Sequence, residues 1–274
     1  VPMIVLTGQQ VLWMLGKDAF QEADIFSITM PVVKHNFLVK KTNDLPKVAR
    51  EAHYIATTGR PGPVLIDIPK NVSQDPFDGE LDPVVNLPGY HPERALEIDE
   101  DCVEQAVKLI NQSRKPVILA GQGCMISRAG DELLKLSRTL GCPVTTTLLG
   151  KGVFPETDEH SLGMLGMHGT AYANKAVVGC DLIMSVGGRW DDRITGKLDE
   201  FCPDAKKIHV DIDPAEHGKV VMPDVFIEGD ARQVLEELIN HVEPLETVDW
   251  LAQIDEWKEK YPLKYGKRGG LKMQ

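Results

Sequence analysis

Short apolar runs alternate with amphipathic stretches along most of this chain. The run PVLIDIP at 63–69 is bounded by Gly and Pro, which predicts a buried strand. The stretch 231–242 instead places Val234, Leu235 and Leu238 on one helical face together with Ile239. Further strands are expected in VPMIVLTG, which we interpret as a buried strand running into a glycine turn, and in PVILAGQG, PVTTTL, LIMSVGG, KIHVDID and VFIEGD. Further helices are expected from Asn43 or Asp44 to Gly59 and around 101–112, 129–140, 171–178 and 248–261.

The order of these elements predicts the fold class and the domain boundaries. From about residue 99 onward, strands and helices alternate regularly, which is typical of a parallel sheet with helices on both faces. We therefore expect an α/β protein with a doubly wound, Rossmann-like domain. The stretch 70–98 is dense in Pro, Gly, Asp and Asn and has no sustained period, so a linker is expected there.

Ligands are expected at the carboxyl ends of the parallel strands, where turns and helix N-termini present free N–H groups. Gly121-Gln122-Gly123 resembles the start of a dinucleotide fingerprint but lacks the third glycine, so a phosphate loop and a tight turn both stay open. Asp211 and Asp213 can meet a ribose hydroxyl or form a polar strand exit. The stretch SVGGRWDDRITG at 185–196 can likewise bind a ligand or form only a turn.

Composition and charge exclude several classes of function. Hydrophobic residues make up 42% and charged residues 26% of the chain, as in a globular protein, and no apolar run approaches the roughly 20 residues of a membrane span. The net charge of -11, without any Lys/Arg stripe, argues against a nucleic-acid partner. Five cysteines without a C-x-x-C pair predict free, mostly buried thiols in a reducing compartment. The eight histidines form no H-E-x-x-H motif or Cys/His cluster, so no metal site is expected.

A series of motifs carries a family resemblance across nearly the whole chain. They are TGQ at 7–9, DAFQE at 18–22, KHNFLV at 34–39, GRPGPVLIDIPK at 59–70, GKGVFPETDEHSLGMLGMHG at 150–169, GGRWDDRITG at 187–196, DIDPAEHGK at 211–219 and EGDAR at 228–232. In this order they resemble the large, catalytic subunit of the acetolactate synthase family, thiamine-diphosphate enzymes that also bind FAD.

The resemblance implies a division into domains. Residues 1–85 would be the later part of the domain that binds the thiamine pyrimidine, 86–98 a linker, 99–245 the central FAD-binding domain, and 246–274 a helical linker toward a diphosphate-binding domain. The glutamate segment that activates thiamine would precede Val1, and the Mg2+-binding motif would follow Gln274. The isolated chain is therefore expected to be inactive.

The resemblance also implies the reaction and the partners. The family joins two pyruvates, or pyruvate and 2-oxobutyrate, with loss of CO2 in branched-chain amino acid biosynthesis. FAD would be structural, and thiamine diphosphate and Mg2+ would belong to the full-length enzyme. A homodimer, with a small regulatory subunit possible, is expected in the bacterial cytoplasm or the plastid stroma. Alternatives are a glyoxylate carboligase or pyruvate oxidase type of enzyme and a non-catalytic flavin-binding fragment.

Five residues are assigned to catalysis by this resemblance. Gln9, Phe20, Gln21 and Lys34 match positions that line the active-site entrance near thiamine diphosphate, across a dimer interface. Phe20 equally fits a plain core position, whereas the Lys34 cation suits an anionic substrate. Arg193 matches the arginine that engages the carboxylate of the second 2-oxo acid, with Asp192 holding its guanidinium in place.

The expected FAD-binding residues form a larger set. From the residues alone, Met167 and His168 would more often be a core methionine and a satisfied histidine, but within the motif they match positions against the flavin. Gly187 and Gly188 are expected to let the backbone approach the cofactor, and Arg189 to meet its phosphates or sugar. The full set is Arg60, Gly121, Gly123, Thr146, Leu165, Gly166, Met167, His168, Gly187, Gly188, Arg189, Asp191, Arg193, Asp211, Ile212, Glu228, Gly229 and Asp230.

Two positions depart from the family pattern. The segment Gln10–Trp13 places bulk where the family commonly has smaller residues, so a changed substrate channel is expected. Trp190 stands where the family usually has Phe, which keeps an aromatic ring at that position.

Overall fold

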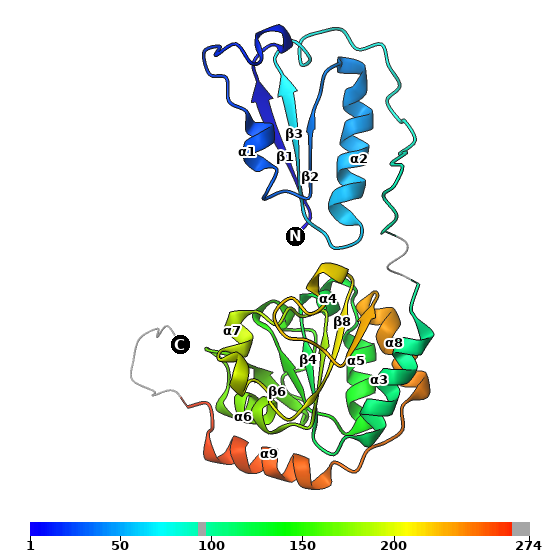
Figure 1. The fold of residues 1–274 in the computed structure, drawn as a ribbon, viewed down its shortest axis with the longest axis vertical. Helices are drawn as coiled ribbons and strands as arrows, with labels where there is room; N and C mark the ends of the chain where they lie inside the picture. Colours follow the sequence, from blue (N-terminus) through cyan, green and yellow to red (C-terminus); the bar gives the residue numbers. More distant parts are fainter. Residues whose placement is uncertain (93–96, 265–274) are drawn as a thin grey trace. The chain divides into compact units, whose positions relative to one another are not determined.

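The computed structural model describes residues 1–92 and 97–264, and the chain divides into two compact units, residues 1–94 and 95–274. The first unit is a three-stranded parallel sheet in the order β1-β3-β2, flanked by helices (Figure 1). Its elements are β1 (Met3–Gln9), η1 (Leu12–Met14), α1 (Ile25–Thr29), β2 (His35–Leu38), η2 (Thr42–Asp44), α2 (Leu45–Thr57) and β3 (Pro63–Pro69).

The second unit holds a six-stranded parallel sheet in the order β6-β5-β4-β7-β8-β9 (Figure 1). The chain winds outward from β4 in one direction and then restarts at β7 in the other, which is the doubly wound topology that the alternation of elements predicted. The strands are β4 (Pro116–Ala120), β5 (Val144–Thr146), β6 (Ser161–Met164), β7 (Leu182–Val186), β8 (Lys206–Asp211) and β9 (Val225–Glu228). The helices are α3 (Glu100–Gln112), α4 (Gln122–Ile126), α5 (Gly130–Leu140), η4 (Leu148–Gly150), α6 (Ala171–Gly179), α7 (Asp192–Thr195), η5 (Leu198–Glu200), η6 (Pro214–Glu216), α8 (Ala231–His241) and α9 (Val248–Lys260).

Both faces of the six-stranded sheet are buried. Alternate residues of β4 show this directly, because Ile118 and Ala120 pack with α3, α5 and α8, whereas Val117 and Leu119 pack with α6 and α9. A strand buried on both faces reads as a continuous apolar run, as PVILA does. The α/β fold with helices on both faces is therefore confirmed. None of the helices in the described residues is long and apolar enough to cross a bilayer.

The interpretation of the first strand as buried is wrong. β1 forms where it was predicted, but it lies at the edge of its sheet, and Met3 and Leu6 are 53% and 66% exposed. Its only strand partner in the described residues is β3, so its other edge and much of its side-chain surface face solvent. No element was predicted at α1, β2 or β6, which are four or five residues long.

The last described helix is anchored by an indole. Trp250 is buried, its Nε1 donates to the Pro116 carbonyl at 3.1 Å, and Ile254 is buried beside it against α6. The 248–261 stretch predicted a charged helix, and the i, i+4, i+7 spacing of Trp250, Ile254 and Trp257 is the signal that indicates its packed face. α9 is thus a structural part of the second unit.

All five cysteines are free, and four are buried. Burial raises the pKa of the Cys124 thiol to about 12 and that of Cys202 to about 11, and it raises those of Cys142 and Cys180 as well. Because folded values lie above the unfolded value near 9, the protonated thiols stabilise the fold fully below that pH, and this contribution is lost as pH rises toward the folded values.

Alkylation tests this burial. We expect iodoacetamide at about pH 8 to modify only the half-buried Cys102 in the folded protein, and all five thiols in guanidinium, because a thiolate is the nucleophile. Mass spectrometry after tryptic digestion counts the modified sites. Rapid modification of Cys124 without denaturant would contradict the packing described here.

Candidate functional site

Two glycine turns meet at the point where the strand order reverses, between β4 and β7. The Gly121 N–H donates to the Val186 carbonyl and the Gly123 N–H to that of Gly187, both at 2.9 Å. A Cβ on Gly121 would lie 2.2 Å from the Gly187 oxygen, and one on Gly123 would lie 2.6 Å from the Gly187 Cα. These glycines therefore bring two backbones into contact. This geometry favours the tight-turn interpretation of Gly121–Gly123.

A third segment closes on the same junction from β5. The Thr147 N–H donates to the Ala120 carbonyl at 3.0 Å, and a Cβ on Gly150 would lie 2.4 Å from that oxygen. Thr146, the last residue of β5, is buried, and its Oγ1 has no hydrogen-bond partner within the described residues. A buried hydroxyl without a partner is costly, so this oxygen at the carboxyl edge fits a site that a polar ligand atom completes.

The LGMHG loop after β6 is tied to α7 and α6. A Cβ on Gly166, whose φ is +92°, would lie 2.4 Å from the Arg193 carbonyl oxygen. Asn174 of α6 holds the same loop from the other side, because its Oδ1 accepts from the Gly166 N–H at 2.9 Å and its Nδ2 donates to the Gly166 carbonyl at 3.1 Å. Loop and helix thus bring two predicted site segments together.

Side chains of this loop divide between core and solvent. Leu165 is buried in the α6 and α9 face, whereas Met167 is 67% exposed and His168 is exposed. The alternative of a core methionine and a satisfied core histidine is therefore wrong. Both side chains stay available to a ligand.

Asp191 organises the charged stretch after β7. It caps α7 by accepting from the Arg193 N–H, and its Oδ2 accepts from Arg189 Nη2 at 3.1 Å. Asp192 approaches the Arg193 guanidinium only to 3.8 Å, and the two side chains are 77% and 72% exposed. An exposed pair of this kind restrains its partners weakly, so the Arg193 guanidinium is available to an incoming anion.

Trp190 of this stretch is one wall of a small cavity. Trp190 stacks on the buried His209 ring with 4.6 Å between centroids, and both Trp190 Nε1 and His209 Nδ1 are buried without a partner in the described residues. Burial lowers the pKa of His209, which keeps the ring neutral and lets Nε2–H donate to the Gly188 carbonyl at 3.0 Å. His209 therefore holds one glycine of the junction. The cavity is lined by Arg189, Trp190, Asp191, His209, Glu216, Lys219, Val220 and Val221.

Several of the predicted FAD-binding residues lie at the ends of β8 and β9. Asp211 is buried and its Oδ1 accepts from the Asp213 N–H at 3.0 Å, while its carbonyl accepts from the Gly229 N–H. The Asp230 carboxylate caps α8 by accepting from the backbone of Arg232 and Gln233. Ile212 is half-buried and Glu228 is exposed at the same edge. Asp211 and Asp230 thus carry structural bonds at the place where the resemblance expects a ligand.

Apolar side chains stand exposed in the segments that follow β4, β5 and β6. The backbones beside them are closely packed through glycine, so these side chains project from the carboxyl edge of the sheet and are not part of a core. The group consists of Met125, Ile126, Leu148, Leu149 and Met167. Together with the partnerless Thr146 hydroxyl and two arginines, they offer the apolar and polar contacts that a flat, phosphate-bearing cofactor requires.

In the first unit, Gln9 is held at the carboxyl end of β1. Its Nε2 donates to Asp67 Oδ2 at 3.1 Å and to the Ala23 carbonyl at 2.6 Å. Asp67 is buried and also accepts from the Thr7 hydroxyl at 2.8 Å. Sequence reasoning missed Asp67, and a lone Asp inside the apolar run PVLIDIP was the signal that could have found it.

Phe20 and Gln21 lie in the turn between η1 and α1. Phe20 is 83% exposed, so its interpretation as a plain core residue is wrong. Gln21 has a φ of +62° and lies beside it. The Gln10 side chain donates to the Phe20 carbonyl, so the unusual Gln10–Trp13 segment and this turn are connected.

Lys34 points to the end of α2. Its Nζ donates to the carbonyls of Ile55 and Thr58 at 2.6 and 2.5 Å and to the Tyr90 hydroxyl at 2.8 Å. A cation at a helix C-terminus stabilises the unpaired carbonyls there. Lys34 therefore has a structural role in this unit, in addition to any contact with substrate.

Arg60 follows Gly59, whose φ is +55°, in the turn that leads to β3. Residues 1–92 and 97–264 contain no group of three or more His, Cys, Asp or Glu that could hold a metal.

Comparisons with known proteins cover both units. Residues 103–238 match the family described as "Thiamine pyrophosphate enzyme, central domain". The acetolactate synthase large subunit of Pyropia yezoensis is 46% identical over 271 residues, that of Parasynechococcus marenigrum (strain WH8102) is 49% identical over 271, and the probable acetolactate synthase large subunit of Methanocaldococcus jannaschii is 49% identical over 264. These alignments cover 96%, 96% and 94% of the chain but 46%, 43% and 44% of the relatives, so the chain spans about half of their length.

Proposed function

Because this chain belongs to the acetolactate synthase family of thiamine pyrophosphate enzymes, we propose that it supplies the flavin-binding domain and part of the thiamine site of an acetolactate synthase. The whole enzyme would condense two pyruvates, or pyruvate and 2-oxobutyrate, with loss of CO2. The observation that carries the proposal is the junction of β4, β5 and β7, where glycine-packed turns meet at the carboxyl ends of the strands and the following segments carry exposed apolar side chains and two arginines.

FAD is the cofactor that this edge fits. Arg189 would bind a phosphate or the ribose, with Asp191 orienting its guanidinium, and Met167 and His168 would lie against the flavin ring. Thr146 Oγ1 would gain the hydrogen bond that it lacks among the described residues. The remaining proposed FAD contacts are Arg60, Gly121, Gly123, Leu165, Gly166, Gly187, Gly188, Asp211, Ile212, Glu228, Gly229 and Asp230. We propose a structural role for the flavin, because condensation with loss of CO2 moves no net electrons.

Catalytic work in this chain would be limited to binding and orienting 2-oxo acids. Arg193 is the proposed carboxylate clamp, since its guanidinium is exposed and its backbone is locked by Gly166 and Asp191. Gln9, Phe20, Gln21 and Lys34 would line the entrance on the first unit. Thiamine diphosphate, with Mg2+ at its diphosphate, supplies the carbanion chemistry when bound. A homodimer, a regulatory subunit and a bacterial cytoplasmic or plastid location belong to the same proposal.

A binding experiment tests the flavin part. We expect the purified chain to quench the fluorescence of added FAD saturably, and Arg189→Met to weaken binding about 10-fold or more through loss of a charge-assisted hydrogen bond. Arg114→Met is the matched control, because Arg114 is exposed beside the amino end of β4. Equal weakening by both variants, or no quenching by a folded chain, would reject FAD as the ligand of this edge.

A chimera tests the reaction. The chain replaces the matching 271 residues of the Parasynechococcus large subunit, and acetolactate is measured from pyruvate with thiamine diphosphate and Mg2+. We expect activity, and we expect Arg193→Met to raise KM for pyruvate about 10-fold or more. A folded, flavin-loaded chimera that makes no acetolactate would refute the proposed reaction while leaving flavin binding intact. Oxygen-dependent turnover instead would support the oxidase alternative.

A further inference from the structure

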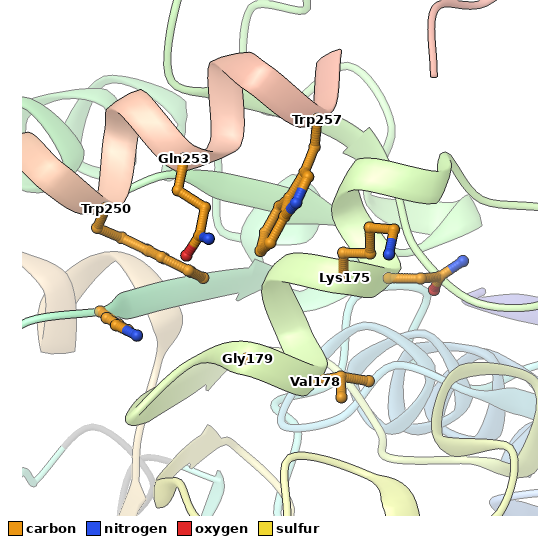
Figure 2. Close-up of a pocket in the computed structure, with 8 residues that line it drawn as sticks. Lys175, Val178, Gly179, Trp250, Gln253 and Trp257 are labelled. Atoms are coloured by element: carbon orange, nitrogen blue, oxygen red, sulfur yellow. The ribbon is translucent and has the colours of Figure 1, made fainter. Parts of the chain in front are cut away.

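A groove lies between α6 and α9 (Figure 2). It begins at Lys115, directly before β4, and therefore at the amino edge of the sheet, whereas the cofactor loops follow the carboxyl ends. Its volume of about 410 Å³ falls within the range of roughly 300–1,000 Å³ typical of small-ligand sites. The lining residues are Lys115, Asn174, Lys175, Val178, Gly179, Trp250, Gln253 and Trp257.

Two indoles form rigid walls of this groove. The Trp250 and Trp257 rings meet edge to face, with 5.7 Å between centroids and an angle of 89°. The Trp250 ring is fixed by its hydrogen bond to the Pro116 carbonyl. Gly179 faces both indoles, because a Cβ there would lie 3.7 and 3.9 Å from their Cη2 atoms. Because Gly179 has no side chain, the groove stays open next to the two indoles.

Two ammonium groups flank the same walls. Lys115 Nζ lies 5.8 Å from the Trp250 ring centroid, and Lys175 Nζ lies 5.9 Å from that of Trp257 and 5.3 Å from that of Tyr261. Across the described ranges 1–92 and 97–264, neither ammonium has a carboxylate partner. The Asp181 carboxylate near Lys115 accepts instead from backbone N–H groups of residues 114 and 115. Within the described residues the two ammonium groups therefore form no ion pair, in a chain whose net charge is -11.

We propose that this groove binds a small organic carboxylate with a flat, apolar body. The body would lie against the indoles and Val178, and the carboxylate would accept hydrogen bonds from Lys115 or Lys175, with the Gln253 amide as a further donor. The Asn174 amide is already engaged by the loop after β6, because its oxygen accepts from the Gly166 N–H and one of its two N–H groups donates to the Gly166 carbonyl. A cationic ligand would meet two like charges, so the charge of the groove selects an anion.

Indole NMR on the full chain tests this site directly. Naphthalene-2-carboxylate is titrated into the 15N-labelled protein, and the N–H signals of Trp13, Trp190, Trp250 and Trp257 are assigned with single Trp→Phe variants. We expect saturable shifts at Trp250 and Trp257, while Trp13 and Trp190, which lie outside the groove, stay in place. Combined Lys115→Met and Lys175→Met substitutions should weaken binding about 10-fold or more.

Matched controls separate charge from simple apolar contact. Lys135→Met removes an exposed ammonium on α5 and should leave the affinity unchanged, whereas Gly179→Leu should fill the groove and abolish the shifts even if the lysine variants fail to fold. Neutral naphthalene-2-carboxamide should bind about 10-fold more weakly than the acid. Equal affinity for acid and amide, equal shifts at all four indoles, or no shifts would each overturn the proposal.

Discussion

Replacing Gly121 by alanine is expected to destabilise the second unit by about 3 kcal/mol or more and to abolish the proposed FAD binding, because one methyl group would occupy the contact between two strand ends. The new Cβ would lie 2.2 Å from the Gly187 oxygen and 2.4 Å from the Gly188 Cα. Both are backbone atoms, and β7 is bonded to strands on either side, so neither atom can swing away as a flexible side chain can. Urea unfolding followed by circular dichroism measures the loss.

Two further substitutions test this contact: one at Gly187, on its other side, and one at Gly179, outside it. Gly187→Ala should be similarly harmful, since its Cβ would lie 2.5 Å from the Gly123 Cα at a φ of +59°, and the double variant should cost less than the sum because both lesions open one contact. Gly179→Ala meets only ordinary contacts at the end of α6 and should change stability by no more than about 1 kcal/mol. If Gly121→Ala had an unchanged urea midpoint and bound flavin normally, the backbone at the junction would be able to shift and accommodate the methyl group.

The junction also shows why the site was only partly predictable. The sequence shows the glycines of GQG and SVGG, and strand alternation correctly predicts that both follow parallel strands. Their mutual contact joins residues more than sixty positions apart, so no local period could reveal it. For GQG a phosphate loop and a tight turn were both open, and for Gly187 the expected reason was approach to a ligand, whereas the contact observed is backbone against backbone.

The local hydrophobic pattern correctly predicted burial in two elements. The run PVILA and the helix of Val234, Leu235 and Leu238 are buried as their periods predict. It failed for β1, because an apolar run indicates a strand but not whether anything covers it. It also gave no signal for His209, which bonds the Gly188 carbonyl, or for Asn174, which bonds the backbone of Gly166, because both roles depend on how turns outside their own elements fold.

Replacing Trp250 by alanine is expected to lower the free energy of unfolding by roughly 3–5 kcal/mol. The side chain is 2% exposed, packs within the α6 face of the sheet and donates to the Pro116 carbonyl. Removing the indole leaves a cavity, takes the Trp250 hydrogen bond from the Pro116 carbonyl, and removes a side chain that packs α9 against the sheet. The loss should reach the cofactor edge, because α6 holds Gly166 through Asn174, so flavin affinity should fall together with the unfolding midpoint.

Trp13→Ala provides the comparison within the same chain. Trp13 is 63% exposed and lies in the other unit, so its removal should change stability by less than about 0.5 kcal/mol. Trp250→Phe separates packing from hydrogen bonding: it keeps most of the apolar volume but loses the N–H donor, and should cost about 1–2 kcal/mol. If Trp250→Ala unfolded with the wild-type midpoint, α9 would not be a structural part of the second unit, and the groove beside it would lack its rigid wall.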